Sequence, residues 1–256
     1  MTLIIAVAGR KGGVGKSSTA VGLASISASQ GLSTLIIDLD TQGNAGTYLG
    51  VMPDHPGVAQ LLAGEEVEPV TCPHEQLITV LVGGPGVHDA AVAAVAPDVL
   101  QGVIDFLAPD VCLIDCPPGR PAVEALATTI ADVLLFVSDP HTAGLGGAQR
   151  VIEDVARSGS KARSALVLQR YDARYAMHKN VLVQASTLFP GLAIHRVSAD
   201  GLLLTATGIG RPFTAWCKEA RKKGAALADL TAIWTWIMAG HDAPSVTTST
   251  TAQKAR

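Results

Sequence analysis

The sequence has few aromatic residues and no long apolar run. Aromatics make up 4% of the 256 residues and apolar residues 48%, so the core has to consist mainly of Ala, Val, Leu and Ile, as buried parallel sheets often do. No stretch of 18 or more uncharged apolar residues occurs, so we predict no transmembrane helix. The N-terminal run 1–9 has no basic segment before its apolar residues, which favours a β-strand over a secretory signal.

The chain also lacks paired cysteines and an excess of positive charge. Cys72, Cys112, Cys116 and Cys217 show no CxxC spacing, so we expect buried free thiols in a reducing compartment. The formal net charge is −3, so the chain as a whole is not a polycation. Any contact with nucleic acid therefore has to come from a local basic patch. The expected location is the cytoplasm.

Short apolar runs alternate with longer segments of helical character. The expected strands span residues 3–8, 34–39, 78–82, 111–115, 133–137, 165–168 and 192–196. The expected helices span residues 16–29, 98–107, 121–129, 145–157, 180–189 and 214–238, the last with a possible break at Gly224. This alternation predicts one α/β domain over residues 1–240, with a mostly parallel, twisted sheet flanked by helices on both faces. Residues 241–256 are rich in Ser, Thr and Ala without apolar periodicity, which predicts a disordered polar tail.

A glycine-rich loop connects the first expected strand to the first expected helix. It ends in Gly15, Lys16 and Ser17. Glycines let backbone N–H groups approach an anion closely, and the N-terminus of the following helix adds its dipole. A lysine at this position neutralises the β- and γ-phosphates, and the serine hydroxyl binds magnesium. The pattern therefore predicts a single-domain P-loop NTPase.

The loop departs from the common P-loop pattern at one position and carries an extra lysine at the next. Arg10 stands where that pattern has glycine, and Lys11 precedes a pair of glycines. This deviant pattern resembles that of the ParA/MinD family of ATPases. The resemblance implies that Lys11 reaches across a dimer to the partner's nucleotide and stabilises the transferring phosphoryl group. The expected nucleotide-binding residues of the loop are Lys11, Gly12, Gly13, Val14, Gly15, Lys16, Ser17 and Ser18.

Acidic residues follow two of the expected strands. Residues 38–44 resemble the family's DxDxQGN segment, with Thr41 where proline is usual. By that resemblance Asp40 orients or deprotonates the attacking water, while Asp38 bonds within its own loop. Residues 111–119 contain the family's LIDCPP sequence and deliver Asp115 at a strand end, where one carboxylate suits a magnesium ion. The expected catalytic residues are Lys11, Lys16 and Asp40, and the expected metal site comprises Ser17, Asp115 and Asp40.

The resemblance is weaker in the second half of the chain. Gln169 and Arg170 stand near the position where the family has an Asn that reads adenine, so we expect them at the nucleotide. Residues 198–207 correspond to a loop that lines the adenine pocket, with Leu204 and Thr205 where relatives often carry a Ser-Glu pair. His141, in a polar loop, is expected to be a surface histidine rather than a catalytic base.

Four cations lie within six positions of the last expected helix. In ParA-type proteins, basic residues of this region bind DNA without sequence preference, through phosphate neutralisation. The resemblance therefore implies a non-specific double-stranded DNA contact, while a solvated helix face is the other interpretation that the residues leave open. No helix-turn-helix region precedes the P-loop, so operator-specific binding is not expected. The four cations are Lys218, Arg221, Lys222 and Lys223.

The resemblance implies a DNA-partition ATPase that hydrolyses ATP slowly with Mg²⁺. ATP would close a homodimer, and a ParB-like centromere-binding protein would stimulate hydrolysis, which places the chain in the cytoplasm at the nucleoid. The alternatives are a MinD-like membrane-associated positioning ATPase, an ATPase that positions a non-DNA cargo, a metallocluster carrier and a non-catalytic scaffold. No membrane contact is expected because the Ser/Thr-rich end lacks a basic amphipathic pattern. We expect Trp234 to pack the last helix onto the core.

Overall fold

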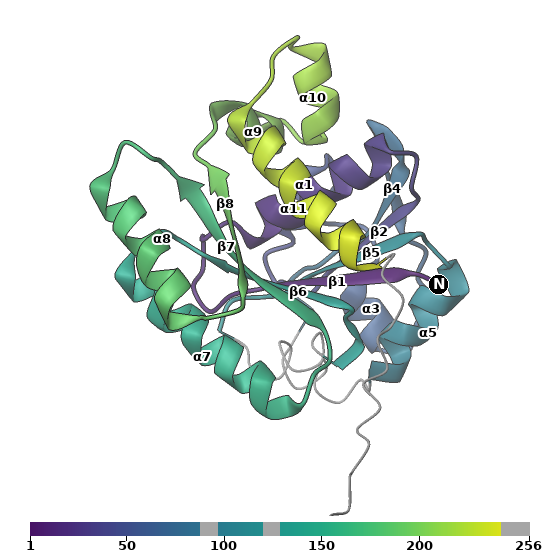
Figure 1. Cartoon of the computed structure of the whole chain (residues 1–256). Helices are drawn as coiled ribbons and strands as arrows, with labels where there is room; N and C mark the ends of the chain where they lie inside the picture. Colours follow the sequence, from purple (N-terminus) through teal and green to yellow (C-terminus); the bar gives the residue numbers. More distant parts are fainter. Residues whose placement is uncertain (88–96, 120–128, 242–256) are drawn as a thin grey trace, which may run out of the picture.

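Eight strands form one sheet in the computed structural model, which describes residues 1–87, 97–119 and 129–241. The strand order is β3-β4-β2-β5-β1-β6-β7-β8 (Figure 1). Every described pairing is parallel except that of β3 with β4. The strands are β1 (Leu3–Ala8), β2 (Thr34–Asp38), β3 (Val70–Cys72), β4 (Glu75–Leu81), β5 (Val111–Asp115), β6 (Val133–Ser138), β7 (Arg163–Tyr171) and β8 (Ala193–Ser198).

Helices cover both faces of this sheet, so its central strands are buried on both sides. In β1, alternate side chains belong to two different apolar clusters: Leu3, Ile5 and Val7 pack with α1 and α11. Their neighbours pack with α5, α7 and α8 on the opposite face (Figure 1). The helices are α1 (Lys16–Ser29), α2 (Asn44–Tyr48), α3 (Val58–Leu62), α5 (Pro97–Leu107), α7 (Thr142–Ser158), α8 (Ala176–Leu188), α9 (Gly201–Gly208), α10 (Phe213–Glu219) and α11 (Ala225–His241).

The predicted α/β fold is confirmed, with corrections at the edges of elements. All seven expected strands are present, but β4 begins at Glu75 instead of residue 78 and β7 extends over Arg163–Tyr171 instead of 165–168. α8 begins at Ala176, four positions before the expected start. The apolar pattern did not predict β3, α2, α3 and α9, which are too short for a repeated pattern to be recognised. The expected helix 121–129 lies, apart from Thr129, outside the described residues, as do 242–256 of the expected tail.

The expected helix 214–238 is two helices, α10 and α11, separated by a turn. After α10, the Lys222 N–H donates to the Cys217 carbonyl and the Arg221 N–H to the Lys218 carbonyl. This pair of bonds is a Schellman motif, which ends a helix with one residue in the left-handed region. Arg221 is that residue, with φ of 51°. The chain therefore turns just before Gly224, the break point that the sequence suggested.

The last helix returns across the sheet and is fixed there by its tryptophans. Trp234 is fully buried, as expected, and its Nε1 donates to Gln30 Oε1 at 2.9 Å. Arg163 of β7 lies over the ring of Trp236 and donates to the Trp236 carbonyl near the end of α11. Among the described residues, no helix has both the length and the apolar character needed to cross a membrane. The four cysteines are buried free thiols, as expected.

Candidate active site

The glycine-rich loop lies where β1 ends and α1 begins, at the carboxyl edge of the sheet. Gly13 and Gly15 have φ of +71° and +104°, a backbone region that residues other than glycine rarely adopt. Gly15 directly precedes the first turn of α1, so the N–H groups at the N-terminus of this helix point toward the loop. The loop therefore has a backbone shape that suits an anion, and it lies at the edge where open α/β sheets bind ligands.

Lys16 is buried beneath this loop. It is 5% exposed, and its Nζ donates to the Lys11 carbonyl at 3.2 Å. An ammonium group held against a backbone carbonyl, in a cradle of N–H groups, is a site that favours an anion.

Gln169 and Arg170 reach the same loop from the end of β7. Gln169 is buried; its Nε2 donates to Thr19 Oγ1 at 2.7 Å, and a Cβ on Gly15 would lie 3.0 Å from its side chain. Arg170, at φ 55°, donates from Nη2 to the Gly13 carbonyl at 2.7 Å. Both residues therefore brace the loop, and their amide and guanidinium groups already make internal hydrogen bonds.

The two acidic strand ends lie side by side. Asp38 of β2 is directly opposite Asp115 of β5 in the parallel register. Asp38 accepts the Asp40 N–H at 2.9 Å and the Ala45 N–H at 3.0 Å, as expected of a residue that orders its own loop. Burial, and then the charge of Asp115, raise the pKa of Asp38 well above its ordinary value. Asp40 accepts the Gln42 N–H and is 8% exposed at the cleft.

Asp115 is a buried carboxylate without a hydrogen-bond partner. Neither of its two oxygens is bonded to any group in the part of the chain that the structure describes. Burial raises its pKa to about 7, while the Ser17 hydroxyl and the Lys16 charge, near but not in bonding geometry, oppose the shift. Such a carboxylate is costly unless a cation pairs with it. Together with the Ser17 hydroxyl, its oxygens form a hard donor set that fits Mg²⁺.

A cleft of about 620 Å³ opens beside the loop, and it brings most of the predicted site residues together. Of the residues expected at the nucleotide and the metal, three do not line it: Lys11 points outward, while Val14 and Asp115 are buried. Of the lining residues, Tyr48 alone lies outside the segments that the sequence singled out, which are 11–18, 38–44, 111–119, 169–170 and 198–207. Tyr48 belongs to no motif that could have predicted this position. The cleft is lined by Gly12, Gly13, Gly15, Lys16, Ser17, Ser18, Asp40, Gln42, Asn44, Tyr48, Pro118, Gln169, Arg170, Ser198, Ala199, Asp200, Gly201, Leu203, Leu204 and Thr207.

The expected adenine-side segment, residues 198–207, does form the far wall of this cleft. Leu203 is mostly buried and Leu204 is 74% exposed at the rim. Of the two residues expected at the position of the family's Ser-Glu pair, Leu204 is therefore an apolar residue at the rim, and Thr205 is absent from the lining. His141 is exposed at the start of α7 and is absent from the cleft lining, in agreement with a surface histidine.

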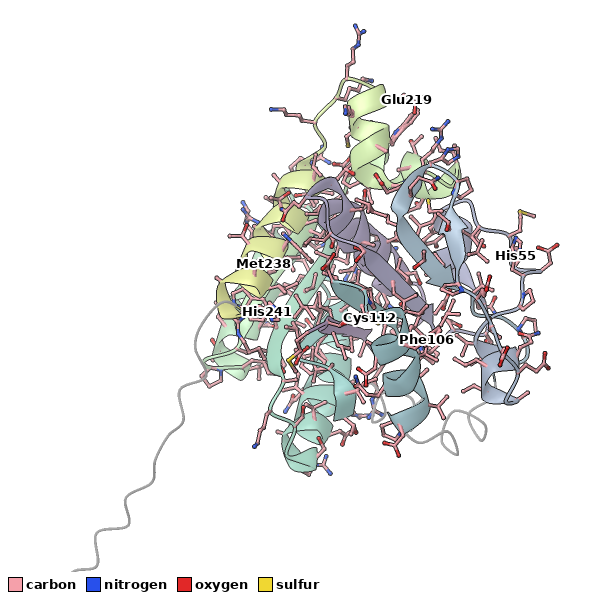
Figure 2. The ribbon with its side chains drawn as sticks, turned by 90° about the vertical axis from the view of Figure 1, so that its right-hand side faces the viewer. His55, Phe106, Cys112, Glu219, Met238 and His241 are labelled. Carbon is pink, nitrogen blue, oxygen red and sulfur yellow. The ribbon has the colours of Figure 1, made fainter. Side chains whose placement is uncertain are left out.

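The four cations of the last expected helix lie together around the end of α10. Lys218, Arg221, Lys222 and Lys223 are all exposed, and none forms a salt bridge within the described ranges. Figure 2 shows Glu219, which lies among them in sequence, at one extremity of the molecule. We call residues 218–223 the basic turn.

A phosphate cradle that opens a helix beside buried carboxylates defines the class: the chain is a P-loop NTPase. The model of a family described as an AAA domain matches residues 2–168. Over 192 residues the chain is 34% identical to the chromosome-partitioning ATPase Soj of Thermus thermophilus, across 72% of this chain and 76% of that protein. It is 27% identical over 212 residues to the chromosome partitioning protein ParA of Caulobacter vibrioides, across 70% and 73% of the two chains.

Solved structures show the same fold. Apo McdA from Cyanothece superposes with a TM-score of 0.76 at 20% identity, across 91% of this chain and 100% of that one. The septum site-determining protein MinD of Pyrococcus horikoshii, complexed with Mg-ADP, superposes with a TM-score of 0.75 at 22% identity, across 95% and 99%. The chain belongs to the ParA/MinD family of P-loop ATPases.

Proposed function

We propose that this ATPase is a DNA-partition ATPase. It binds and slowly hydrolyses ATP with Mg²⁺, closes into a dimer around ATP, binds DNA without sequence preference and responds to a ParB-like centromere-binding protein. The observation that carries the DNA step is the basic turn. Four exposed cations gather there that form no salt bridge with the residues the structure describes, in a chain of net charge −3. The proposal places the protein in the cytoplasm, associated with the nucleoid.

The P-loop holds the triphosphate in this proposal. Backbone N–H groups of Gly12, Gly13 and Gly15 and the ammonium of Lys16 bind its phosphate oxygens, and Gln169 and Arg170 keep the loop in shape. Ser17 and Asp115, with Asp40 nearby, would hold Mg²⁺, which when bound neutralises phosphate charge.

Asp40 has the position for the water-directing role. It lies at the cleft, follows the strand beside Asp115, and keeps an oxygen free of the Gln42 contact. Phosphoryl transfer asks a protein mainly to position the nucleophile and to stabilise charge. A carboxylate at this place orients a water and accepts its proton as the water attacks.

Lys11 supports the dimer step. Its side chain is 67% exposed beside the cleft rather than inside it, so it faces outward from its own site. A cation so placed can reach a nucleotide bound by a second subunit and stabilise charge on the transferring group.

The relatives support the segregation role as well as the ATPase class. The proteins named Soj and ParA are described as chromosome-partitioning proteins. The basic turn supplies the sequence-independent contact that such a role needs, since phosphate contacts dominate non-specific DNA affinity. A membrane-positioning ATPase of the MinD kind and an ATPase for a non-DNA cargo are the functions that a negative DNA result would favour.

The test compares two double variants that each remove two positive charges. Lys222→Gln with Lys223→Gln removes charge from the basic turn, and Arg150→Gln with Lys161→Gln removes exposed charge elsewhere. Binding to a random-sequence duplex is measured with ATP at fixed salt. We expect the basic-turn variant to lose at least about tenfold in affinity and the control to lose little. Equal losses in both would contradict the DNA assignment.

A further inference from the structure

Asp200 connects the nucleotide cleft to the basic turn through its two carboxylate oxygens. The residue lines the cleft at the start of α9. Its Oδ1 accepts the Leu202 N–H at 2.7 Å and so caps α9, while its Oδ2 accepts the Ala226 N–H at 2.9 Å. Ala226 is in the first turn of α11, three positions after Lys223. One side chain therefore connects the cleft wall to the start of α11, the helix that follows the basic turn.

A second contact of the same kind lies nearby. Asp229 of α11 accepts the Ser198 N–H at 2.8 Å, and Ser198 is also a lining residue of the cleft. Gly224 is packed directly against the Asp200 carboxylate, so that a Cβ at this position would lie 2.4 Å from Oδ2. The start of α11 is thus hydrogen-bonded to the far wall of the cleft at two points. At Gly224 the chain packs so closely against this wall that no side chain would fit.

The other end of the basic turn is fastened to the phosphate side. The basic turn begins in the last residues of α10, and Thr214 of this helix donates two hydrogen bonds to Ser25 of α1. The Thr214 N–H donates to Ser25 Oγ at 2.8 Å, and Thr214 Oγ1 donates to the Ser25 carbonyl at 3.1 Å. α1 is the helix that the P-loop opens. Both ends of the basic turn are therefore anchored on elements that contact the nucleotide site.

We propose that Asp200 is a positioning residue that transmits the occupancy of the cleft to the basic turn. The inference rests on the proposed function of this turn as a DNA contact. A nucleotide that fills the cleft presses on the wall of residues 198–207, and α1 responds to its phosphates. α10 is hydrogen-bonded to α1, and α11 is hydrogen-bonded to Asp200. A movement of α1 relative to the wall of residues 198–207 therefore changes the path of residues 218–223. The cations of the turn then adopt the arrangement that contacts DNA only when the cleft is filled.

Gly224→Ala tests the contact between Asp200 and the start of α11 without changing a residue that lines the cleft. The added methyl group meets the Asp200 carboxylate, and Gly224 does not have a left-handed φ that would strain alanine. Gly208→Ala is the matched control, since a Cβ there has no atom within 4 Å. We expect both variants to bind ATP within about twofold of the parent. In Gly224→Ala the gain in DNA affinity on adding ATP should fall at least fivefold; the same gain in both variants would overturn the inference.

Hydrogen exchange separates this inference from the proposed function. In the parent chain, ATP should change the exchange rate of the amides of residues 221–226. Asp229→Ala, which removes the acceptor of the Ser198 N–H, should reduce that change severalfold even if Gly224→Ala folds poorly. An ATP-independent exchange rate in the parent overturns the inference whatever the DNA result. An amide exchange rate that depends on ATP, in a protein that binds no DNA, would support the transmission through Asp200 and contradict the DNA-binding role.

Discussion

The Nζ atom of Lys11 lies 2.6 Å from Oδ2 of Asp139, within the same subunit. The two partners differ in exposure: the Lys11 side chain is 67% exposed and the Asp139 side chain 8%. A Cβ at Gly144, in the first turn of α7, would lie 2.2 Å from Asp139 Oδ1, so the carboxylate is fixed by close packing. The lysine that would serve a partner's nucleotide in the proposed dimer is therefore paired with a carboxylate of its own chain.

Asp139→Asn should release Lys11 and favour the ATP-bound dimer. Since the lysine is largely exposed, its ion pair contributes no more than about 1 kcal/mol, so we expect dimerisation to tighten severalfold rather than by orders of magnitude. Asparagine avoids leaving a buried, unpaired charge. Sedimentation with ATP gives the dimer affinity, and Lys11→Ala is the control that should abolish the dimer. An unchanged dimer affinity in Asp139→Asn would mean that the pair does not restrain Lys11.

Asp115→Asn should stabilise the nucleotide-free protein and remove its Mg²⁺ site. The folded-state pKa of Asp115, about 7, is above the ordinary value of 3.8, so the folded chain binds more protons between these values and loses stability as pH rises through them. Asparagine cannot ionise. Its stability advantage in urea should therefore grow from pH 4 to pH 8, by more than about 1 kcal/mol. The same pH dependence in both proteins would show that Asp115 ionises without cost.

Much of this site could be predicted because its residues lie in contiguous motifs. The P-loop, Asp38, Asp40 and Asp115 all stand at strand ends, and parallel pairing brings such ends to one edge. The contacts that the sequence could not give join distant segments. Asp200 to Ala226 is one of them, because it depends on where α9 and α11 pack and has no local pattern.

The expected adenine contacts illustrate the same limit from the opposite direction. Gln169 was placed at the nucleotide by resemblance, near the position of the family's adenine-reading Asn, and it does line the cleft. Its amide is nevertheless bonded to Thr19, because α1 packs beneath the end of β7. Position along the chain predicted where the residue lies, while helix packing determined which partner its amide has.

Arg221→Gly should stabilise the fold and weaken DNA binding. Arg221 occupies a left-handed position that glycine adopts without strain, so relief of this strain should add about 1 kcal/mol to the free energy of unfolding. The same change removes one cation of the basic turn. Urea denaturation and DNA affinity, measured on the same preparation, give both effects. A less stable variant would show that the arginine side chain makes contacts that outweigh the backbone strain.

Lys16→Ala should abolish ATP binding, because it removes the buried cation beneath the P-loop. Calorimetric titration with Mg-ATP measures the affinity, and Lys161→Ala, an exposed lysine far along the chain, is the control. Unchanged affinity in Lys16→Ala would place the nucleotide elsewhere.

Asp40→Ala should leave ATP binding and dimerisation in place while hydrolysis falls by tenfold or more, since the water loses the group that orients it. Phosphate release during a single turnover reports this step separately from binding. Turnover at the parent rate would remove Asp40 from the catalytic role.

The most direct test of the partition role is binding of the full chain to a random-sequence duplex over a salt series, with ATP, with ADP and without nucleotide. We predict that tight binding appears only with ATP. Each phosphate neutralised should contribute about −0.9 to the slope of log affinity against log salt concentration. With four basic-turn cations in each subunit of a dimer, that slope should be no steeper than about −7 from this region. DNA binding that is absent in every nucleotide state, in a protein that still binds ATP, would contradict the partition role.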